Sequence, residues 1–249
     1  MAISLKPVGE QVIVITGASS GIGLATAEMA AEEGAKLILA APSEDALEGF
    51  AARLSRNGAE ALAVDADVGD RAEVEQIALA AIERFGRIDT WLNNAGVTIP
   101  GRLDQTSDAD CRRLFETNFW GVVYGSLVAL HHMRAAGGAI INLGSDISDA
   151  AIPLQGMYAA SKQAVKGFTD ALRAEVEDMD GAPVAITLLP IETTDPAQVA
   201  AAILKAAAHH SREGKTKTNG ISKIDTTVAK VLPKVDEKVT AKVANKNGR

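Results

Sequence analysis

Runs of apolar residues alternate with amphipathic stretches along most of the chain. The first run, Val12–Thr16, is rich in β-branched residues and lacks polar alternation, as is typical of a strand buried on both faces. After a glycine-rich turn, Leu24–Glu33 has apolar residues at helical spacing and is closed by Gly34, a helix-stop residue. The same alternation continues to Leu189, which predicts parallel strands connected by helices.

The predicted elements follow one another in a regular order. Strands are predicted over Val12–Thr16, Lys36–Ala40, Ala61–Val64, Thr90–Asn93, Ala139–Gly144 and Val184–Leu189. Helices are predicted over Leu24–Glu33, Glu44–Arg56, Val74–Phe85, Asp108–Ala135, Tyr158–Asp178 and Pro196–His210. Because the two kinds of element alternate, we expect an α/β fold with a doubly wound parallel sheet of the Rossmann type, in a single domain over residues 1–211.

The last part of the chain, residues 212–249, has a different composition. It carries ten Lys and Arg against four Asp and Glu, whereas residues 1–211 have a net charge of −13. A narrow stripe of valines follows Pro233, which is expected to break or restart a helix. We predict a basic C-terminal extension that packs on its own domain or on a neighbouring subunit. A membrane-surface helix is the alternative, disfavoured because the stripe lacks aromatic and bulky residues.

Composition narrows the class of protein further. The chain has 249 residues, 47% of them hydrophobic, which suffices to bury a substantial core. Its acidic body argues against nucleic acid as a partner. Cys111 is the single cysteine, so no internal disulfide forms. No apolar run reaches the roughly 18 residues of a membrane span, and no N-terminal signal is present. We expect a cytoplasmic protein without a membrane partner.

The first glycine-rich turn has two chemical interpretations. Gly17–Gly21 satisfies the nucleophile-elbow pattern G-x-S-x-G of α/β-hydrolases. Alternatively, the glycines let the backbone approach a nucleotide phosphate at the start of a helix. The hydrolase mechanism needs an acid and then a histidine later in the chain, and the histidines stand in two pairs near helix ends: His131, His132, His209 and His210. We therefore favour the phosphate turn. Four histidines and one cysteine form no convincing set of metal ligands, so we predict no metal site.

A tyrosine and a lysine four residues apart provide a second signal. Tyr158 and Lys162 share one face of a predicted helix. A neighbouring ammonium stabilises the phenolate and lowers the pKa of a tyrosine, which makes it a usable general acid and base. Ser145 follows a predicted strand, at the edge where ligands bind in open parallel sheets. Ser145 is therefore a better candidate for a catalytic hydroxyl than Ser19 or Ser20.

These motifs together resemble one enzyme family. The segments TGASSGIG, NNAG (Asn93–Gly96) and YAASK, with Asn118 and Ser145 between them, are similar in order and spacing to the short-chain dehydrogenase/reductase family. The resemblance runs from about Gln11 to Leu189. It implies an oxidoreductase that transfers a hydride between a nicotinamide cofactor and a carbonyl or alcohol substrate.

The resemblance also assigns roles to individual residues. It implies cofactor contacts in three segments: Gly17, Ser19, Ser20, Gly21, Ile22 and Gly23 at the pyrophosphate and adenosine ribose, Asp67 and Val68 at the adenine, and Asn94, Ala95 and Gly96 at a ribose. Tyr158 would exchange a proton with the substrate oxygen. Lys162 would bind the nicotinamide ribose and lower the pKa of Tyr158. Ser145 would hydrogen-bond the substrate, and Asn118 would hold a water connecting Lys162 to solvent.

The cofactor, NAD or NADP, is normally selected just after the second strand. An acidic residue there binds the adenosine 2′-hydroxyl of NAD, and a basic residue pairs with the 2′-phosphate of NADP. This chain has Ala41 and Pro42 at those positions, and Ser20 at a position that is sometimes basic in NADP users. With no carboxylate to repel a phosphate, NADP is slightly favoured.

The chain departs from the family pattern after Pro190. A mobile lid usually covers the substrate there, but in this chain the predicted helix from Pro196 begins almost at once. We expect the lid to be absent, because the gene is shortened or because a disordered segment was omitted from the numbered chain. A missing lid weakens the exclusion of water and so disfavours efficient turnover.

Two functions remain open at this stage. The first is an NAD(P)-dependent dehydrogenase or reductase acting on a small carbonyl or alcohol. The second is a non-catalytic NAD(P)-binding sensor or scaffold, which the missing lid favours and the intact Ser145, Tyr158 and Lys162 set disfavours. By the same resemblance, the two long helices pair across a twofold axis, which predicts a homodimer or homotetramer.

Overall fold

The core of the protein is one six-stranded parallel sheet. The computed structural model describes residues 3–42, 44–145, 153–177, 179 and 183–209. In that part of the chain the strands lie in the order β3-β2-β1-β4-β5-β6. Their bounds are β1 Val12–Thr16, β2 Lys36–Ala41, β3 Ala61–Asp65, β4 Thr90–Asn93, β5 Gly138–Leu143 and β6 Val184–Leu189. The predicted doubly wound fold is confirmed, and its topological switch point lies between β1 and β4.

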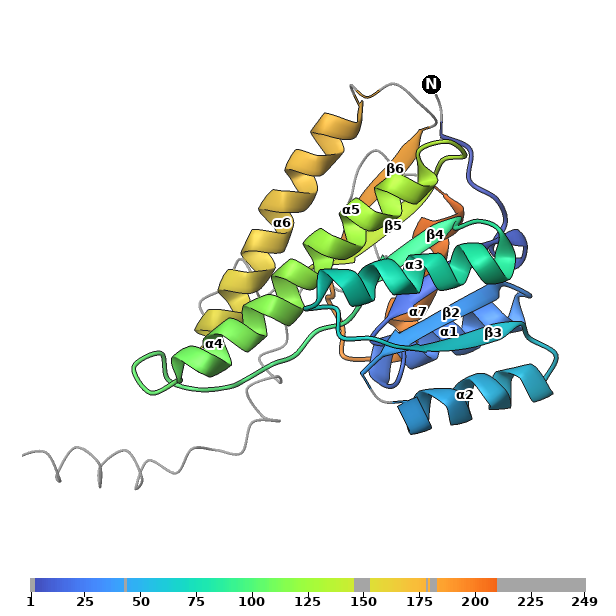
Figure 1. The fold of residues 1–249 in the computed structure, drawn as a ribbon. Helices are drawn as coiled ribbons and strands as arrows, with labels where there is room; N and C mark the ends of the chain where they lie inside the picture. The colour runs from blue at the N-terminus through green and yellow to red at the C-terminus, as the bar shows by residue number, and fades with distance from the viewer. Residues whose placement is uncertain (1–2, 43, 146–152, 178, 180–182, 210–249) are drawn as a thin grey trace, which may run out of the picture. The chain divides into compact units, whose positions relative to one another are not determined.

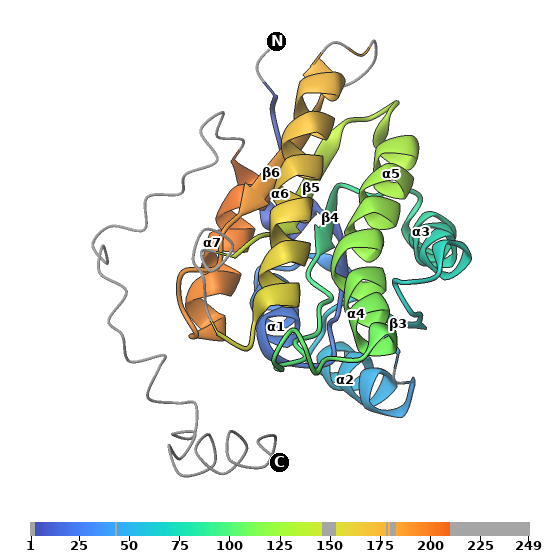
Figure 2. The same cartoon turned by 90° about the vertical axis from the view of Figure 1, so that its left-hand side faces the viewer.

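Helices cover both faces of the sheet (Figures 1 and 2). The helices α1 (Gly21–Glu32), α2 (Glu44–Arg56) and α7 (Pro196–Ala208) pack on one face. The opposite face carries α3 (Arg71–Phe85), α5 (Gly121–Met133) and α6 (Gly156–Glu177). A short helix, α4 (Asp108–Phe115), precedes α5, and a 3-10 turn, Val8–Glu10, precedes β1.

The unbroken apolar pattern of β1 follows from burial on both faces. Ile13 and Ile15 pack into the core under α1, α2 and α7, whereas Val14 packs into the core under α3, α5 and α6. All five residues of the strand are buried. Since neither face of the strand contacts water, its apolar residues do not alternate with polar ones.

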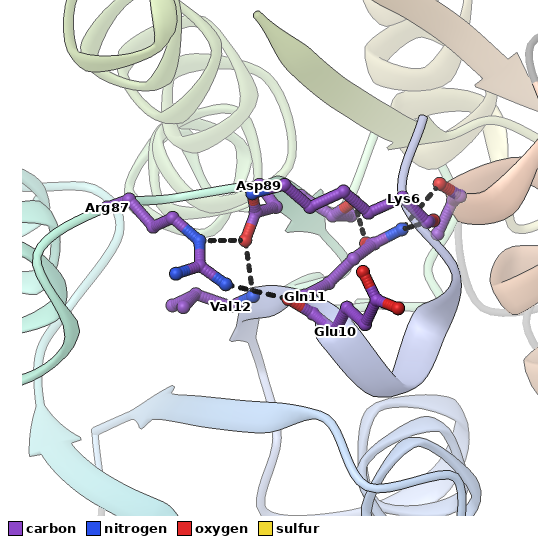
Figure 3. Close-up of polar contacts among 8 residues, drawn as sticks. Lys6, Glu10, Gln11, Val12, Arg87 and Asp89 are labelled. Carbon is purple, nitrogen blue, oxygen red and sulfur yellow. Dashed lines mark hydrogen bonds and ion pairs between the residues drawn. The ribbon is translucent and has the colours of Figure 1, made fainter. Parts of the chain in front are cut away.

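A polar cluster ties together the amino-terminal edge of the sheet (Figure 3). The carboxylate of Asp89 accepts hydrogen bonds from Lys6 Nζ at 2.6 Å and from the main-chain amide of Val12 at 2.8 Å. It also accepts one from Arg87 Nε at 2.8 Å. Buried Gln11 donates from Nε2 to the carbonyl oxygen of Ala207, at the end of α7. These bonds fasten the edge opposite the strand ends at which ligands bind in such sheets.

The predicted helix over Asp108–Ala135 is wrong as a single α-helix. The chain forms α4, then a π-helical turn over Glu116–Trp120, and then α5, which ends at Met133. Asn118 stands inside the turn, and its side chain is fully buried and bonded to the main chain of Val97. Apolar periodicity does not reveal such a turn, because the residues around it keep helical character.

Most other element bounds lie within three residues of the predictions. The helices α1 and α3 begin earlier than expected, at Gly21 and Arg71. Their first turns contain mostly small or polar residues, Ile22 being the exception in α1, and in α3 the carboxylate of Asp70 caps the amide of Ala72. Hydrophobic periodicity starts only where a helix first touches the core, so it misses these turns.

All described residues belong to one compact unit, Met1–Gly214. The predicted boundary at residue 211, the basic extension 212–249 and His210 lie outside the described residues. Within the described part of the chain, no helix combines the length and the hydropathy needed to span a membrane.

Candidate functional site

A cleft of about 610 Å³ opens at the carboxyl ends of the central strands. Ten of the predicted cofactor residues line it: Gly17, Ser19, Ser20, Gly21, Ile22, Asp67, Val68, Asn94, Ala95 and Gly96. Gly23, Tyr158 and Lys162 are not among its lining residues. The lining also includes Ala66, Gly69, Asp70, Val97, Arg113, Glu116 and Thr117, which sequence motifs did not indicate.

The turn between β1 and α1 leaves no room for a Cβ at two glycine positions. Gly17 has a φ of +64°, and a Cβ there would lie 2.8 Å from the Cα of Ala95. A Cβ on Gly23 would collide with the carbonyl oxygen of Gly17. Ser20 is the N-cap of α1 but makes no side-chain capping bond. The amides and positive dipole end of α1 therefore remain available for an anion in the cleft.

Two polar residues hold this turn against the loop that follows β4. The Oγ1 of Thr16 accepts hydrogen bonds from the amides of Asn94 at 3.0 Å and Ala95 at 3.1 Å. The Nδ2 of Asn94 donates back to the carbonyl oxygens of Thr16 at 2.8 Å and Gly17 at 3.0 Å. These hydrogen bonds hold together the two loops that form the floor of the cleft. The sequence did not indicate this role of Thr16, because a threonine after four apolar residues is typical of the end of a strand.

One end of the cleft lies between the ends of β2 and β3 and the helix α4. Val68 is buried, and a Cβ on Gly121 would lie 2.7 Å from its Cγ2, so α5 packs directly on this residue. The carboxylate of Asp67 accepts from the amide of Gly69 at 2.8 Å. Ala41 and Pro42, at the end of β2, complete this end of the cleft and bring no carboxylate.

Tyr158 and Lys162 lie on consecutive turns of α6, as predicted. The Lys162 ammonium lies 5.8 Å from the centroid of the Tyr158 ring. Its Nζ also donates to the carbonyl oxygen of Leu143, the last residue of β5, at 3.0 Å. Ser145 stands two residues beyond that strand end and is buried. The structure therefore places all three residues at the carboxyl edge of the sheet.

Asn118 connects the loop after β4 to α6. Its Oδ1 accepts from the amide of Val97 at 2.7 Å, and its Nδ2 donates to the carbonyl oxygen of Val97 at 2.9 Å. The same Nδ2 lies 3.3 Å from the Oγ of Ser161, which donates to the carbonyl oxygen of Tyr158 at 2.7 Å. Asn118 thus joins the wall of the cleft to the helix that carries the tyrosine. A π-helical turn at a functional residue is a recurrent arrangement.

A buried polar network lies beneath this edge of the sheet. Asn93 donates to the Oδ1 of Asn142 at 2.8 Å, and Asn142 donates to the Oγ1 of Thr169 at 3.0 Å. Trp91 Nε1 donates to the Oδ1 of Asn93 at 2.8 Å. The network fixes α6 against β4 and β5 from below. The sequence signal for this network is an asparagine near the ends of two buried strands; the NNAG motif includes Asn93 but not Asn142.

Burial lowers the pKa of Lys162 to about 8, because desolvation penalises the ammonium. The side chain is only 5% exposed. At neutral pH the group still carries its proton for most of the time. The positive charge beside Tyr158 is therefore present, and burying it lowers the free energy of unfolding.

This cost predicts a measurable pH dependence of stability. In the unfolded chain Lys162 titrates near pH 10.5, so between about pH 8 and 10.5 the unfolded state binds more protons and stability rises with pH. Relative to Lys162→Met, the free energy of unfolding of the wild type should rise by about 3 kcal/mol across this window. Urea denaturation of both proteins at several pH values measures the difference, and a pH-independent difference would contradict the prediction.

Comparison with protein families matches residues 11–211 to the short chain dehydrogenases. The chain belongs to the short-chain dehydrogenase family. This membership favours the phosphate-turn interpretation of Gly17–Gly21 over the hydrolase interpretation. The chain is similar to the uncharacterized oxidoreductase YxnA of Bacillus subtilis, to which it is 48% identical over 189 residues. The match covers 75% of this chain but 53% of YxnA, so the chain spans about half the length of that relative.

Solved structures of other proteins share the fold. An alcohol dehydrogenase from the archaeon Thermococcus sibiricus, complexed with 5-hydroxy-NADP, is 29% identical with a TM-score of 0.71. The alignment covers 78% of this chain and 89% of the other. A short-chain dehydrogenase/reductase from Burkholderia phymatum, complexed with NAD, is 32% identical with a TM-score of 0.69 and covers 82% and 81%. NAD and a derivative of NADP are thus both bound by proteins of this fold.

Proposed function

We propose that the protein is an NAD(P)-dependent oxidoreductase that interconverts a carbonyl compound and an alcohol. The observation that carries this proposal is the pair on α6, with the buried Lys162 ammonium 5.8 Å from the Tyr158 ring. A protein that only binds a dinucleotide has no need to bury a cation beside a tyrosine. The pair lies at the same edge of the sheet as the dinucleotide-sized cleft.

The cleft suits a dinucleotide. The amino terminus of α1 and the close-packed turn at Gly17 and Gly23 fit a pyrophosphate, since main-chain amides point at it and no Cβ blocks the approach. Val68, Asp67 and the end of β2 offer an apolar and hydrogen-bonding surface for an adenosine. A bound nicotinamide would supply the hydride chemistry, which no side chain of the protein provides.

The residues of the chain handle the proton and the geometry. Tyr158 passes a proton to or from the substrate oxygen, and Lys162 stabilises the phenolate when the proton has left. Ser145 hydrogen-bonds the substrate oxygen from the end of β5. Asn118 keeps α6 at a fixed distance from the loop after β4, through Val97 and Ser161. Its role in holding a water for Lys162 remains part of the proposal.

NADP is the cofactor we favour. Ala41 and Pro42 place no carboxylate where a 2′-phosphate would lie, and Ser19 and Ser20 offer hydroxyls on the same cleft. The alternative function is a non-catalytic sensor or scaffold. It is supported by the short connection between β6 and α7, which consists of residues 190–195. A segment of this length offers little cover for a substrate.

A direct assay tests the proposal. The purified protein is incubated with NADPH or NADH and a panel of ketones and aldehydes, and in the reverse direction with alcohols, while absorbance of the reduced nicotinamide is followed. We expect turnover with at least one carbonyl and more efficient use of NADPH. Cofactor binding without turnover on any member of the panel would favour the sensor, and a higher kcat/KM with NADH would overturn the preference for NADP.

We further propose that the protein is a dimer or tetramer that pairs through α5. The side chains of Trp120 and Leu127 are 44% and 41% exposed, and Tyr124 between them stacks on Trp120 with ring centroids 5.7 Å apart. Figure 1 shows α5 and α6 side by side on the outer layer. Such an apolar helix face is typical of a contact between copies.

Light scattering tests the assembly. The wild type should have a mass of at least twice 25.9 kDa, and Leu127→Glu should reduce the mass towards that of one chain. Leu79→Glu is the matched control, because Leu79 is 45% exposed on α3 and the change in charge is equal. A monomeric wild type, or equal dissociation of both variants, would contradict the proposed interface.

A further inference from the structure

Arg113 is the only basic residue that lines the cleft within the described part of the chain. It stands on α4, and the lining residues of opposite charge are Asp67, Asp70 and Glu116. The proposed cofactor is itself an anion, yet the cleft presents three carboxylates and one guanidinium. The position of Arg113 therefore matters for the balance of charge along the cleft.

The side chain of Arg113 makes no hydrogen bond and no ion pair with any other described residue. Glu116 stands one turn further along, at a spacing that allows an ion pair on a helix, but the two are not paired. Some arginines elsewhere are engaged, such as Arg53 with Glu28 at 2.7 Å and Arg87 with Asp89 at 2.8 Å. Others, such as Arg112, have no such partner among the described residues, and Arg113 differs from Arg112 in that it lines the cleft. An exposed, unpaired guanidinium in a ligand cleft is available to an incoming anion.

The turn that follows Arg113 packs at the adenosine end of the cleft. A Cβ on Gly69 would lie 3.5 Å from the Cβ of Glu116, so the turn after α4 contacts the segment that follows Val68. The pyrophosphate site at the start of α1 already has main-chain amides to neutralise it. At the adenosine end, a 2′-phosphate is the one additional anion that separates NADP from NAD.

We propose that Arg113 is a specificity-determining residue that binds the 2′-phosphate of NADP. The proposal rests on the proposed function, because it takes the cleft to hold a dinucleotide. The guanidinium offsets the repulsion from Asp67, Asp70 and Glu116 and donates hydrogen bonds to phosphate oxygens. The preference for NADP then depends on a helix that lies outside the β2 region where cofactor choice is normally read.

Binding of cofactor fragments tests Arg113 without any turnover. Adenosine 2′,5′-bisphosphate and AMP differ by the 2′-phosphate, as NADP and NAD do, and calorimetry of the full chain gives the dissociation constant of each. In Arg113→Ala we expect about 10- to 100-fold weaker binding of adenosine 2′,5′-bisphosphate and NADP, from loss of a charge-assisted bond. AMP and NAD should bind within about twofold of the wild type.

Arg112→Ala is the matched control, since Arg112 is the exposed neighbour on α4 and does not line the cleft. It should leave all four dissociation constants unchanged. An equal loss of NAD and NADP in Arg113→Ala would show stacking on adenine and overturn the proposal, as would no loss or the same loss in Arg112→Ala. If the wild type bound neither dinucleotide, the proposed function itself would be wrong.

Discussion

Replacing Tyr158 by phenylalanine should abolish turnover while leaving cofactor binding intact. The substitution removes one hydroxyl and keeps the ring 5.8 Å from the Lys162 ammonium, so the fold and the cleft are preserved. General acid–base catalysis contributes about 100- to 10,000-fold to rates, and we expect kcat to fall by about 1,000-fold or more. Steady-state kinetics with the best substrate of the panel measures the loss, and titration of NADPH measures the binding.

The chain offers a matched control for this experiment. It has two tyrosines, and the second, Tyr124, lies on α5 against Trp120. Tyr124→Phe removes the same atom away from the cleft and keeps the ring that stacks on Trp120, so it should keep kcat within about twofold of the wild type. If Tyr158→Phe retained the activity of Tyr124→Phe, the proposed proton transfer would be wrong and Ser145 would become the leading candidate.

Replacing Gly23 by alanine should destroy the phosphate turn. The added methyl group would collide with the carbonyl oxygen of Gly17 and lie 2.6 Å from the Nδ2 of Asn94. Neither neighbour can move away cheaply, because one is backbone and the other bonds the carbonyl oxygens of Thr16 and Gly17. Overpacking of this kind costs about 1–3 kcal/mol, so we expect about 10- to 100-fold weaker NADPH binding and a lower Tm.

Gly49→Ala separates this steric effect from the general effect of removing a glycine. Gly49 lies within α2, and a Cβ there would meet no atom within 4 Å. Alanine in an open helical position should stabilise the protein by about 0.5–1 kcal/mol. Wild-type affinity for NADPH in Gly23→Ala would mean that the cleft does not use this turn for a phosphate.

The short-range pattern of the chain was sufficient to predict the fold class. β1 and β4 occupy the predicted ranges, Val12–Thr16 and Thr90–Asn93. Burial on both faces of a parallel sheet leaves continuous apolar runs, and amphipathic helices leave a period of 3.6 residues. Both signals are local, so the sequence carries them without reference to the rest of the molecule.

The motifs likewise predicted most of the candidate site. A glycine turn after a strand and a Tyr–Lys pair on one helix face are local patterns with a chemical reason for their spacing. The structure brought ten of the predicted cofactor residues to one cleft and placed the Lys162 ammonium near the Tyr158 ring. The roles of Tyr158, Lys162, Ser145 and Asn118 in catalysis, and the individual cofactor contacts, stay predictions.

The tertiary structure alone decided how these parts are held and charged. The sequence does not show that Asn118 lies in a π-helical turn and binds Val97, or that Thr16 bonds the loop after β4. It does not show that Arg113 reaches the cleft while Arg112 does not. Each of these facts depends on residues far apart in the chain meeting at one edge of the sheet. A pattern read along the backbone records which face a residue prefers, whereas the partner it meets there is set by the packing of separate elements.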